Sequence, residues 1–167
     1  MLPITLTALA LLAAADTEPA DANATKIVAR SRGPHARADV KAAGKDKTQL
    51  VIRSAAELVA AVPMYKDRDA LPAAVEMAAT ADLAKELAVK DIDWTKQMVV
   101  VVSDGSKSSG GYRVEVTGLE IKDKTMTVKW KLHSPKGIAT RAFTHPSEVV
   151  FVPKFAGKVV FDPAKDK

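Results

Sequence analysis

The chain has 167 residues, which is enough for one domain of ordinary size once a leader or a linker is subtracted. It carries 25 Lys and Arg residues against 20 Asp and Glu residues, but the two signs are interspersed and no basic run is long enough to follow a phosphate backbone. Cysteine is absent, which excludes disulfides, thiolate metal ligands and cysteine nucleophiles. We therefore expect a single domain and no nucleic-acid partner.

The N-terminal segment has the features of a signal peptide over residues 1–15. An apolar stretch over residues 2–12 precedes Ala13-Ala14-Ala15, which satisfies the small-x-small pattern for cleavage. A second small-x-small triplet makes a leader over residues 1–22 the alternative. The stretch is shorter than the ~20 apolar residues that cross a bilayer, so we expect no stable membrane span. Although the stretch has no Lys or Arg before it, we predict export to the periplasm or the extracellular space.

The next segment, residues 16–47, is rich in Ala, Asp, Lys and Arg and has no sustained hydrophobic periodicity. It contains Ser31-Arg32-Gly33-Pro34, a composition typical of a turn. We predict a flexible linker here, because the ends of domains are commonly poorly ordered.

Residues 48–163 form the predicted domain, and its first part indicates two helices. A β-prone run over residues 49–53 is followed by Ser54 and Glu57, which have the spacing of a capping box. The helix that begins there is expected to end at Val62, because Pro63 follows.

A second helix is predicted over residues 72–89, with Pro72 in its first turn. Apolar residues recur at four-residue spacing and mark one stripe that would pack on a sheet; these are Val75, Ala79, Leu83 and Leu87. We expect Met77 to belong to the same core.

The second half of the domain indicates strands. Residues 98–102 form a continuous apolar run, which is typical of a central strand covered on both faces. Alternating residues from Tyr112 to Thr117 predict a half-buried strand, joined to the central one by a hairpin. Further strands are predicted over residues 126–133, 148–152 and 158–161. The expected fold class is α+β, with a mainly antiparallel sheet in the C-terminal half and two N-terminal helices packed on it.

The polar loop after the central strand invites a nucleotide-binding interpretation, which its residues contradict. Gly105 and Gly110 have the outer spacing of a phosphate-binding loop, but Gly111-Tyr112 stand where Lys and Ser or Thr are required. The pattern that follows is that of a strand, whereas a phosphate loop opens a helix. The histidines His35, His133 and His145 lie far apart and form no metal-ligand spacing. We therefore predict no cofactor and no metal site.

Two alternative functions use residues of the strands and loops. A hydrolase would combine one of the serines 106, 108 or 109 with His133 or His145 and with Asp104, although the G-x-S-x-G elbow is absent. We prefer turn-forming roles for these hydroxyls. A polyanion or cell-wall polymer binder would use the lysine-bearing strand face around Lys129 and Lys131. The pair Asp91 and Asp93 is interpreted as a solvated turn rather than as an acid and base.

Residues 94–161 resemble the C-terminal domain of the PrcB protease-complex subunit family of exported bacterial proteins. The resemblance is carried by MVVVVSDG at 98–105, SSGGYRVEV at 108–116 and THPSEVVFVPK at 144–154. It implies a noncatalytic accessory protein that associates with or stabilises a secreted protease. It supplies no catalytic residues.

The candidate partner-contact residues come from the last two of these segments. Gly110 and Gly111 can adopt backbone angles denied to other residues and can approach another segment closely. The alternative is that the glycines serve hairpin geometry only and that the Tyr112 ring is part of the core. The candidate set is Ser108, Ser109, Gly110, Gly111, Tyr112, Arg113, Thr144, His145 and Pro146.

Overall fold

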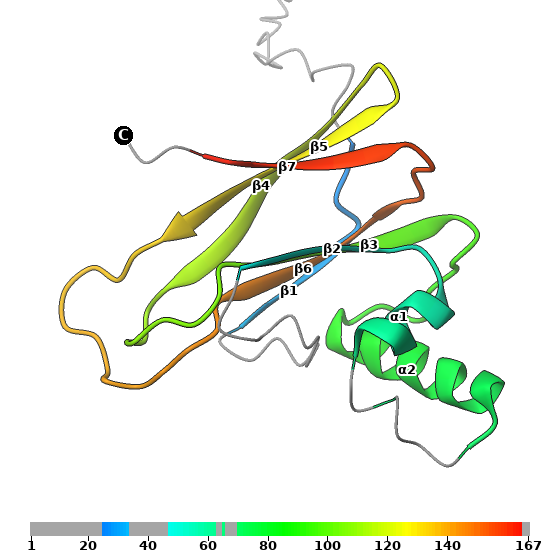
Figure 1. Cartoon of the computed structure of the whole chain (residues 1–167), viewed down its shortest axis with the longest axis horizontal. Helices are drawn as coiled ribbons and strands as arrows, with labels where there is room; N and C mark the ends of the chain where they lie inside the picture. Colours follow the sequence, from blue (N-terminus) through cyan, green and yellow to red (C-terminus); the bar gives the residue numbers. More distant parts are fainter. Residues whose placement is uncertain (1–24, 34–46, 63–64, 66–69, 165–167) are drawn as a thin grey trace, which may run out of the picture.

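The structure is a computed structural model that describes residues 25–33, 47–62, 65 and 70–164. The described residues form two helices and seven strands (Figure 1). In chain order these are β1 (Ala29–Gly33), β2 (Thr48–Ile52), α1 (Ala55–Ala61), α2 (Pro72–Glu86), β3 (Gln97–Ser103), β4 (Arg113–Lys122), β5 (Thr125–His133), β6 (Ser147–Pro153) and β7 (Lys158–Pro163). The predicted leader over residues 1–15, or 1–22, lies outside the described residues.

The strands are divided between two sheets. One sheet has the order β1-β6-β3-β2 and is antiparallel throughout. The other has the order β4-β5-β7, in which β4 and β5 are antiparallel and β5 and β7 are parallel. The predicted α+β class with mainly antiparallel pairing is therefore confirmed. The chain passes from β6 in the first sheet to β7 in the second sheet, where β7 pairs with β5 in parallel.

The two sheets bury an apolar layer between them. Strand β3 shows how the sequence produces it, because successive side chains of a strand point to opposite faces. Met98, Val100 and Val102 lie in the cluster shared with β4, β5 and β6, whereas Val99 and Val101 lie in the cluster shared with the helices. Each of these five side chains is at most 3 % exposed, which confirms the prediction of a central strand covered on both faces.

The helices cover the outer face of the four-stranded sheet. The Ser54 hydroxyl accepts a hydrogen bond from the Glu57 amide, and the Glu57 carboxylate accepts one from the Arg53 amide. The Ser54 half of the predicted capping box is therefore formed at the N-terminus of α1, whereas Glu57 reaches back to the amide before Ser54 instead of the Ser54 amide. The stripe of α2 is buried as predicted, from Val75 to Leu87, but Met77 is 73 % exposed. The expectation for Met77 is wrong, because it lies two residues from Val75 and points away from the stripe.

Strands β4 and β5 form a hairpin whose turn residues, Asp123 and Lys124, both have positive φ angles. Two such residues form the turn that matches the twist of paired strands. A β-bulge interrupts the pairing between Val116 and Gly118 and bends β4.

Two further sequence-based expectations are wrong. Strand β1 lies inside the segment expected to be a flexible linker, and Ser31 pairs with Val149 of β6 instead of forming a turn. The expected hairpin between β3 and β4 is also absent: β3 pairs with β2 and β6, and the loop after it crosses to the other sheet. Short connections suggested direct pairing, but the buried faces of β3 and β4 pack against each other across the core.

Candidate functional site

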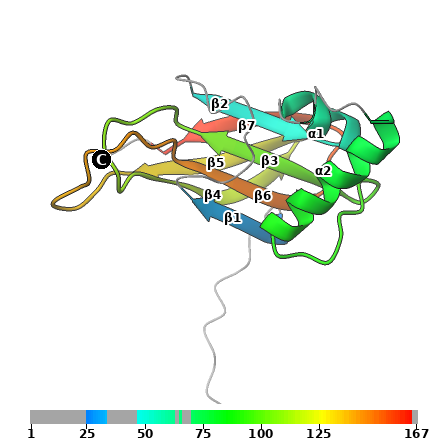
Figure 2. The same ribbon diagram turned by 90° about the horizontal axis from the view of Figure 1, so that it is seen from below.

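The two segments that carry the candidate residues meet in space. The loop 104–112 and the loop 134–146 are joined by an antiparallel bridge between Lys107 and Thr144. The Lys107 amide donates to the Thr144 carbonyl at 2.8 Å, and the Thr144 amide donates back at 3.0 Å. We call these two segments the loop pair. Figures 1 and 2 show it at the end of the sandwich opposite the helices.

Further hydrogen bonds extend the loop pair on both sides of the bridge. The Thr144 hydroxyl donates to the Ser109 carbonyl at 2.9 Å, and the Gly110 amide donates to the Thr140 carbonyl at 2.9 Å. At the base, the Asp104 amide donates to the carbonyl of the buried Pro146 at 3.2 Å. The loop pair is therefore held along most of its length by backbone contacts.

The two glycines allow the loops to approach each other. A Cβ atom on Gly110 would lie 2.4 Å from the Thr140 hydroxyl oxygen. A Cβ atom on Gly111 would lie 2.7 Å from the Pro135 Cβ, and Gly111 has a φ angle of +83°. Both positions thus require glycine, for close approach at the first and also for backbone angle at the second. They serve a loop crossing between sheets and not the expected hairpin.

The remaining candidate residues differ in their surroundings. Ser108 and Arg113 are exposed, whereas Tyr112 is half-buried and has the Lys107 ammonium 5.7 Å from its ring centroid. His145 is half-buried, and its Nδ1 atom is buried without a hydrogen-bond partner in the structure. The Tyr112 ring is consequently only partly available to a partner, and Ser108 is open to one.

A buried carboxylate lies at the base of the loop pair, where the first loop begins. Asp104 is 4 % exposed and forms ion pairs with Lys47 at 2.8 Å and with Lys107 at 2.5 Å. Burial raises the pKa of this carboxyl, but hydrogen bonds and charge attraction from Lys107 and Lys47 outweigh it and hold the pKa below its ordinary value. Asp104 was considered from sequence only as a hydrolase candidate, whereas its contacts show a structural role at the base of the loops.

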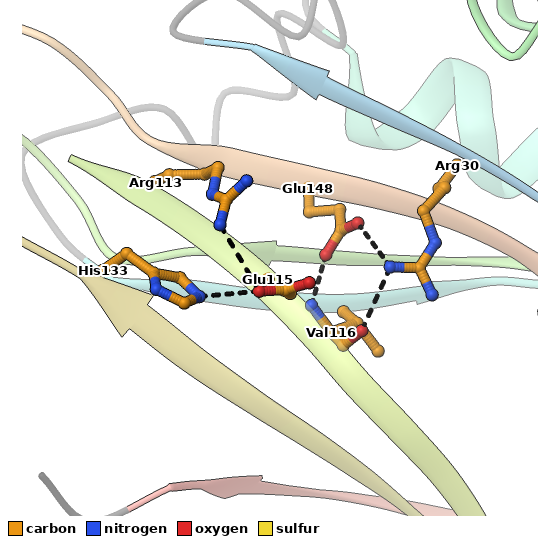
Figure 3. A network of polar contacts seen from close by, with 6 residues as sticks. All are labelled: Arg30, Arg113, Glu115, Val116, His133 and Glu148. Atoms are coloured by element: carbon orange, nitrogen blue, oxygen red, sulfur yellow. Dashed lines mark hydrogen bonds and ion pairs between the residues drawn. The ribbon is translucent and has the colours of Figure 1, made fainter. Parts of the chain in front are cut away.

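A second buried carboxylate joins the two sheets (Figure 3). Glu148 of β6 is fully buried and accepts a hydrogen bond from the Val116 amide of β4. Arg30 of β1 lies 3.4 Å from the Glu148 carboxylate and also donates to the Val116 carbonyl at 3.4 Å. The two charged side chains thus satisfy both backbone polar groups of Val116, next to the bulge. We call these three residues the inter-sheet clamp.

Sequence reasoning missed the inter-sheet clamp. Glu148 stands beside a valine-rich run and offers no motif, and its partner Arg30 lies 118 positions earlier, in the predicted linker. The one available signal is an acidic residue at an inward position of a buried strand, because such residues are almost never buried without a partner.

Two residues of the hydrolase alternative, His133 and Asp104, are engaged in other contacts. His133 contacts the Glu115 carboxylate at 2.7 Å, and Arg113 lies 3.6 Å from the same group (Figure 3). In the part of the chain that the structure describes, no hydrogen bond joins His133 or His145 to the serines at 106, 108 or 109. The described contacts therefore do not include the serine–histidine hydrogen bond of a triad.

Residues of the other chemical alternatives also form contacts within the chain. The pKa of Asp93 is lowered to about 2 by hydrogen bonds from the side chain and the backbone of Thr95, as in a turn. Lys129 on the lysine-bearing face pairs with Glu120 at 2.9 Å, which partly neutralises that face. Within residues 25–33, 47–62, 65 and 70–164, no group of three or more His, Asp or Glu side chains could hold a metal ion. No helix of the described chain is both long and apolar enough to cross a membrane.

One feature of the loop pair was not predicted. Ile138 is fully exposed and Phe143 is 77 % exposed, and both belong to the loop 134–146. No periodicity marks residues outside helices and strands as buried or exposed, so only the structure could identify them.

Comparison with known proteins finds a family model that matches this region. Residues 98–153 match the family model described as PrcB C-terminal, which confirms the resemblance drawn from the sequence. The match runs from β3 to the end of β6, includes the whole loop pair, and lies inside the expected range of 94–161. The chain has no match among curated proteins or among solved structures.

Proposed function

We propose that the chain is an exported, noncatalytic accessory protein that binds a partner protein through the loop pair, because residues 98–153 match the PrcB C-terminal family model. The partner is a secreted protease, which the chain associates with or stabilises. The apolar segment over residues 2–12 supports export, as argued from the sequence.

The observation that carries this proposal is the construction of the loop pair. The two loops, which both lie within the family match, are held together by backbone hydrogen bonds and project together at the end of the sandwich away from the helices (Figure 2). Loops placed on a rigid scaffold are where binding residues concentrate. A surface already ordered before binding loses less conformational entropy on association.

A noncatalytic role is supported by the engagement of the polar side chains. Asp104 is neutralised by two lysines, and His133 is held by Glu115. A catalytic site would instead place an activated nucleophile and a base in contact at an accessible position.

The experiment is co-purification from the envelope fraction of the native organism, combined with deletion of the gene. We expect a tagged wild-type chain to enrich one exported protease, and deletion to lower the amount or the activity of that protease. Recovery of the chain without any enriched protease, together with unchanged protease levels after deletion, would refute the proposal.

A further inference from the structure

Two large apolar side chains lie exposed on one loop. Single exposed hydrophobic residues are common and carry little information, but a concentration of them marks an interaction site. Of the five exposed large hydrophobic residues in the described part of the chain, Ile138 and Phe143 share the loop 134–146. The other three, which lie outside the loop pair, are Val28, Leu71 and Met77.

The backbone between these side chains is fixed by the neighbouring loop. Thr140 lies between Ile138 and Phe143, and its carbonyl accepts the Gly110 amide. Thr144, next to Phe143, forms the bridge to Lys107. The two apolar side chains are therefore presented from an anchored backbone, so that little backbone ordering is required when they are buried.

The same loop is positively charged. Lys136 and Arg141 are exposed, and residues 134–146 include no Asp or Glu. Neither Lys136 nor Arg141 forms an ion pair with another described residue, in contrast to Lys107, which is bound to Asp104. Exposed cations on the same loop as exposed apolar side chains favour a partner with carboxylates around an apolar depression.

From these observations we propose that Ile138 and Phe143 insert into an apolar pocket of the partner, and that Lys136 and Arg141 pair with Asp or Glu side chains at its rim. This inference rests on the proposed function and specifies the chemistry of the partner surface. Gly110, Gly111 and the Lys107–Thr144 bridge then act as the support of this surface and not as its binding groups.

A library of random peptides displayed on phage provides a defined probe. The wild-type chain and Met77→Ser, an exposed apolar residue on the helix α2, serve as matched baits beside the double variant Ile138→Ser/Phe143→Ser. We expect the first two baits to enrich peptides that combine an apolar or aromatic residue with Asp or Glu. The affinity of a synthesised enriched peptide is expected to fall at least about tenfold with the double variant.

Charge is tested separately with Lys136→Glu/Arg141→Glu and with salt. This variant should weaken binding of the same peptide severalfold, and added salt should weaken binding to the wild-type chain, because exposed charges are screened. Three results would overturn the inference. The wild-type chain could enrich peptides without acidic residues, it could enrich no peptides beyond those enriched by Ile138→Ser/Phe143→Ser, or the enriched peptide could bind this variant and the wild type equally. If the native protease co-purifies equally with the wild type and the double variant, this inference fails while the proposed function stands.

Discussion

The inter-sheet clamp and the loop pair depart from the usual distribution of side chains in opposite ways. The clamp places the charged Glu148 in the apolar layer between the sheets, whereas the loop pair leaves Ile138 and Phe143 in solvent. Folded proteins rarely bury a charge without partners and gain nothing from exposing large apolar groups. The inter-sheet clamp serves the fold, because its polar groups are satisfied internally. The exposed apolar groups of the loop pair have no such internal partners, and the binding role that we propose for the loop pair rests on this difference.

The largest loss of stability is expected from a substitution in the inter-sheet clamp. Glu148→Ala removes the acceptor of the buried Val116 amide and leaves a cavity, so we expect the free energy of unfolding to fall by about 2–4 kcal/mol. Urea unfolding measures this free energy for the variant and the wild type. Glu120→Ala, which removes only a surface ion pair with Lys129, is the control and should change stability by less than about 1 kcal/mol. Equal losses in the two variants would contradict a structural role for Glu148.

The next effect is on the glycine that supports the loop pair. Gly111→Ala introduces both an unfavourable φ angle and a contact with Pro135, and we expect it to destabilise the chain by about 1–3 kcal/mol. Gly118→Ala is the matched control, because its Cβ would have no atom within 4 Å. If thermal unfolding shifts equally for both variants, the close approach of the two loops is not what requires glycine.

The sequence predicted most helices and strands and the two segments that hold the candidate residues. It did not predict the contacts that join segments distant in the chain. Ser54 and Glu57 lie three positions apart, and the apolar run over residues 98–102 is continuous, so both features can be recognised from residues close together in the chain. Strand β1 was missed because Arg30 and Arg32 interrupt any apolar pattern, and because its partner β6 lies more than a hundred residues away. The pairing of Lys107 with Thr144 is a contact between backbones, which side-chain types do not encode.

A smaller and pH-dependent effect is expected at the base of the loop pair. Asp104→Asn removes the charge that binds Lys47 and Lys107 and should cost about 1–2 kcal/mol at neutral pH. The pKa of Asp104 is lowered in the folded chain, so its contribution is fully present above the ordinary aspartate pKa of ~3.9 and is lost as the pH falls through the lower folded value.

The stability difference between wild type and Asp104→Asn should therefore be constant near neutral pH and shrink below about pH 4. Urea unfolding across that range measures the difference, with Asp162→Asn, an exposed residue of β7, as the control. A difference that grows on acidification would show that the two lysines do not stabilise the Asp104 carboxylate.

The smallest expected change in stability belongs to the exposed side chains. Ile138→Ser/Phe143→Ser removes apolar groups that are already in solvent, and the free energy of unfolding should stay within about 0.5 kcal/mol of the wild type. A loss comparable to that of Gly111→Ala would mean that these side chains stabilise the loop itself.

Partner binding through the loop pair is tested most directly by quantitative co-purification of exported proteases from the native envelope. Tagged wild type, Met77→Ser and Ile138→Ser/Phe143→Ser are compared at equal expression, with folding verified by thermal unfolding. We predict that the first two retain one and the same protease and that the double variant loses it. Equal retention by all three chains would contradict binding through Ile138 and Phe143, and retention of no protease by any of them would contradict the proposed association with a protease.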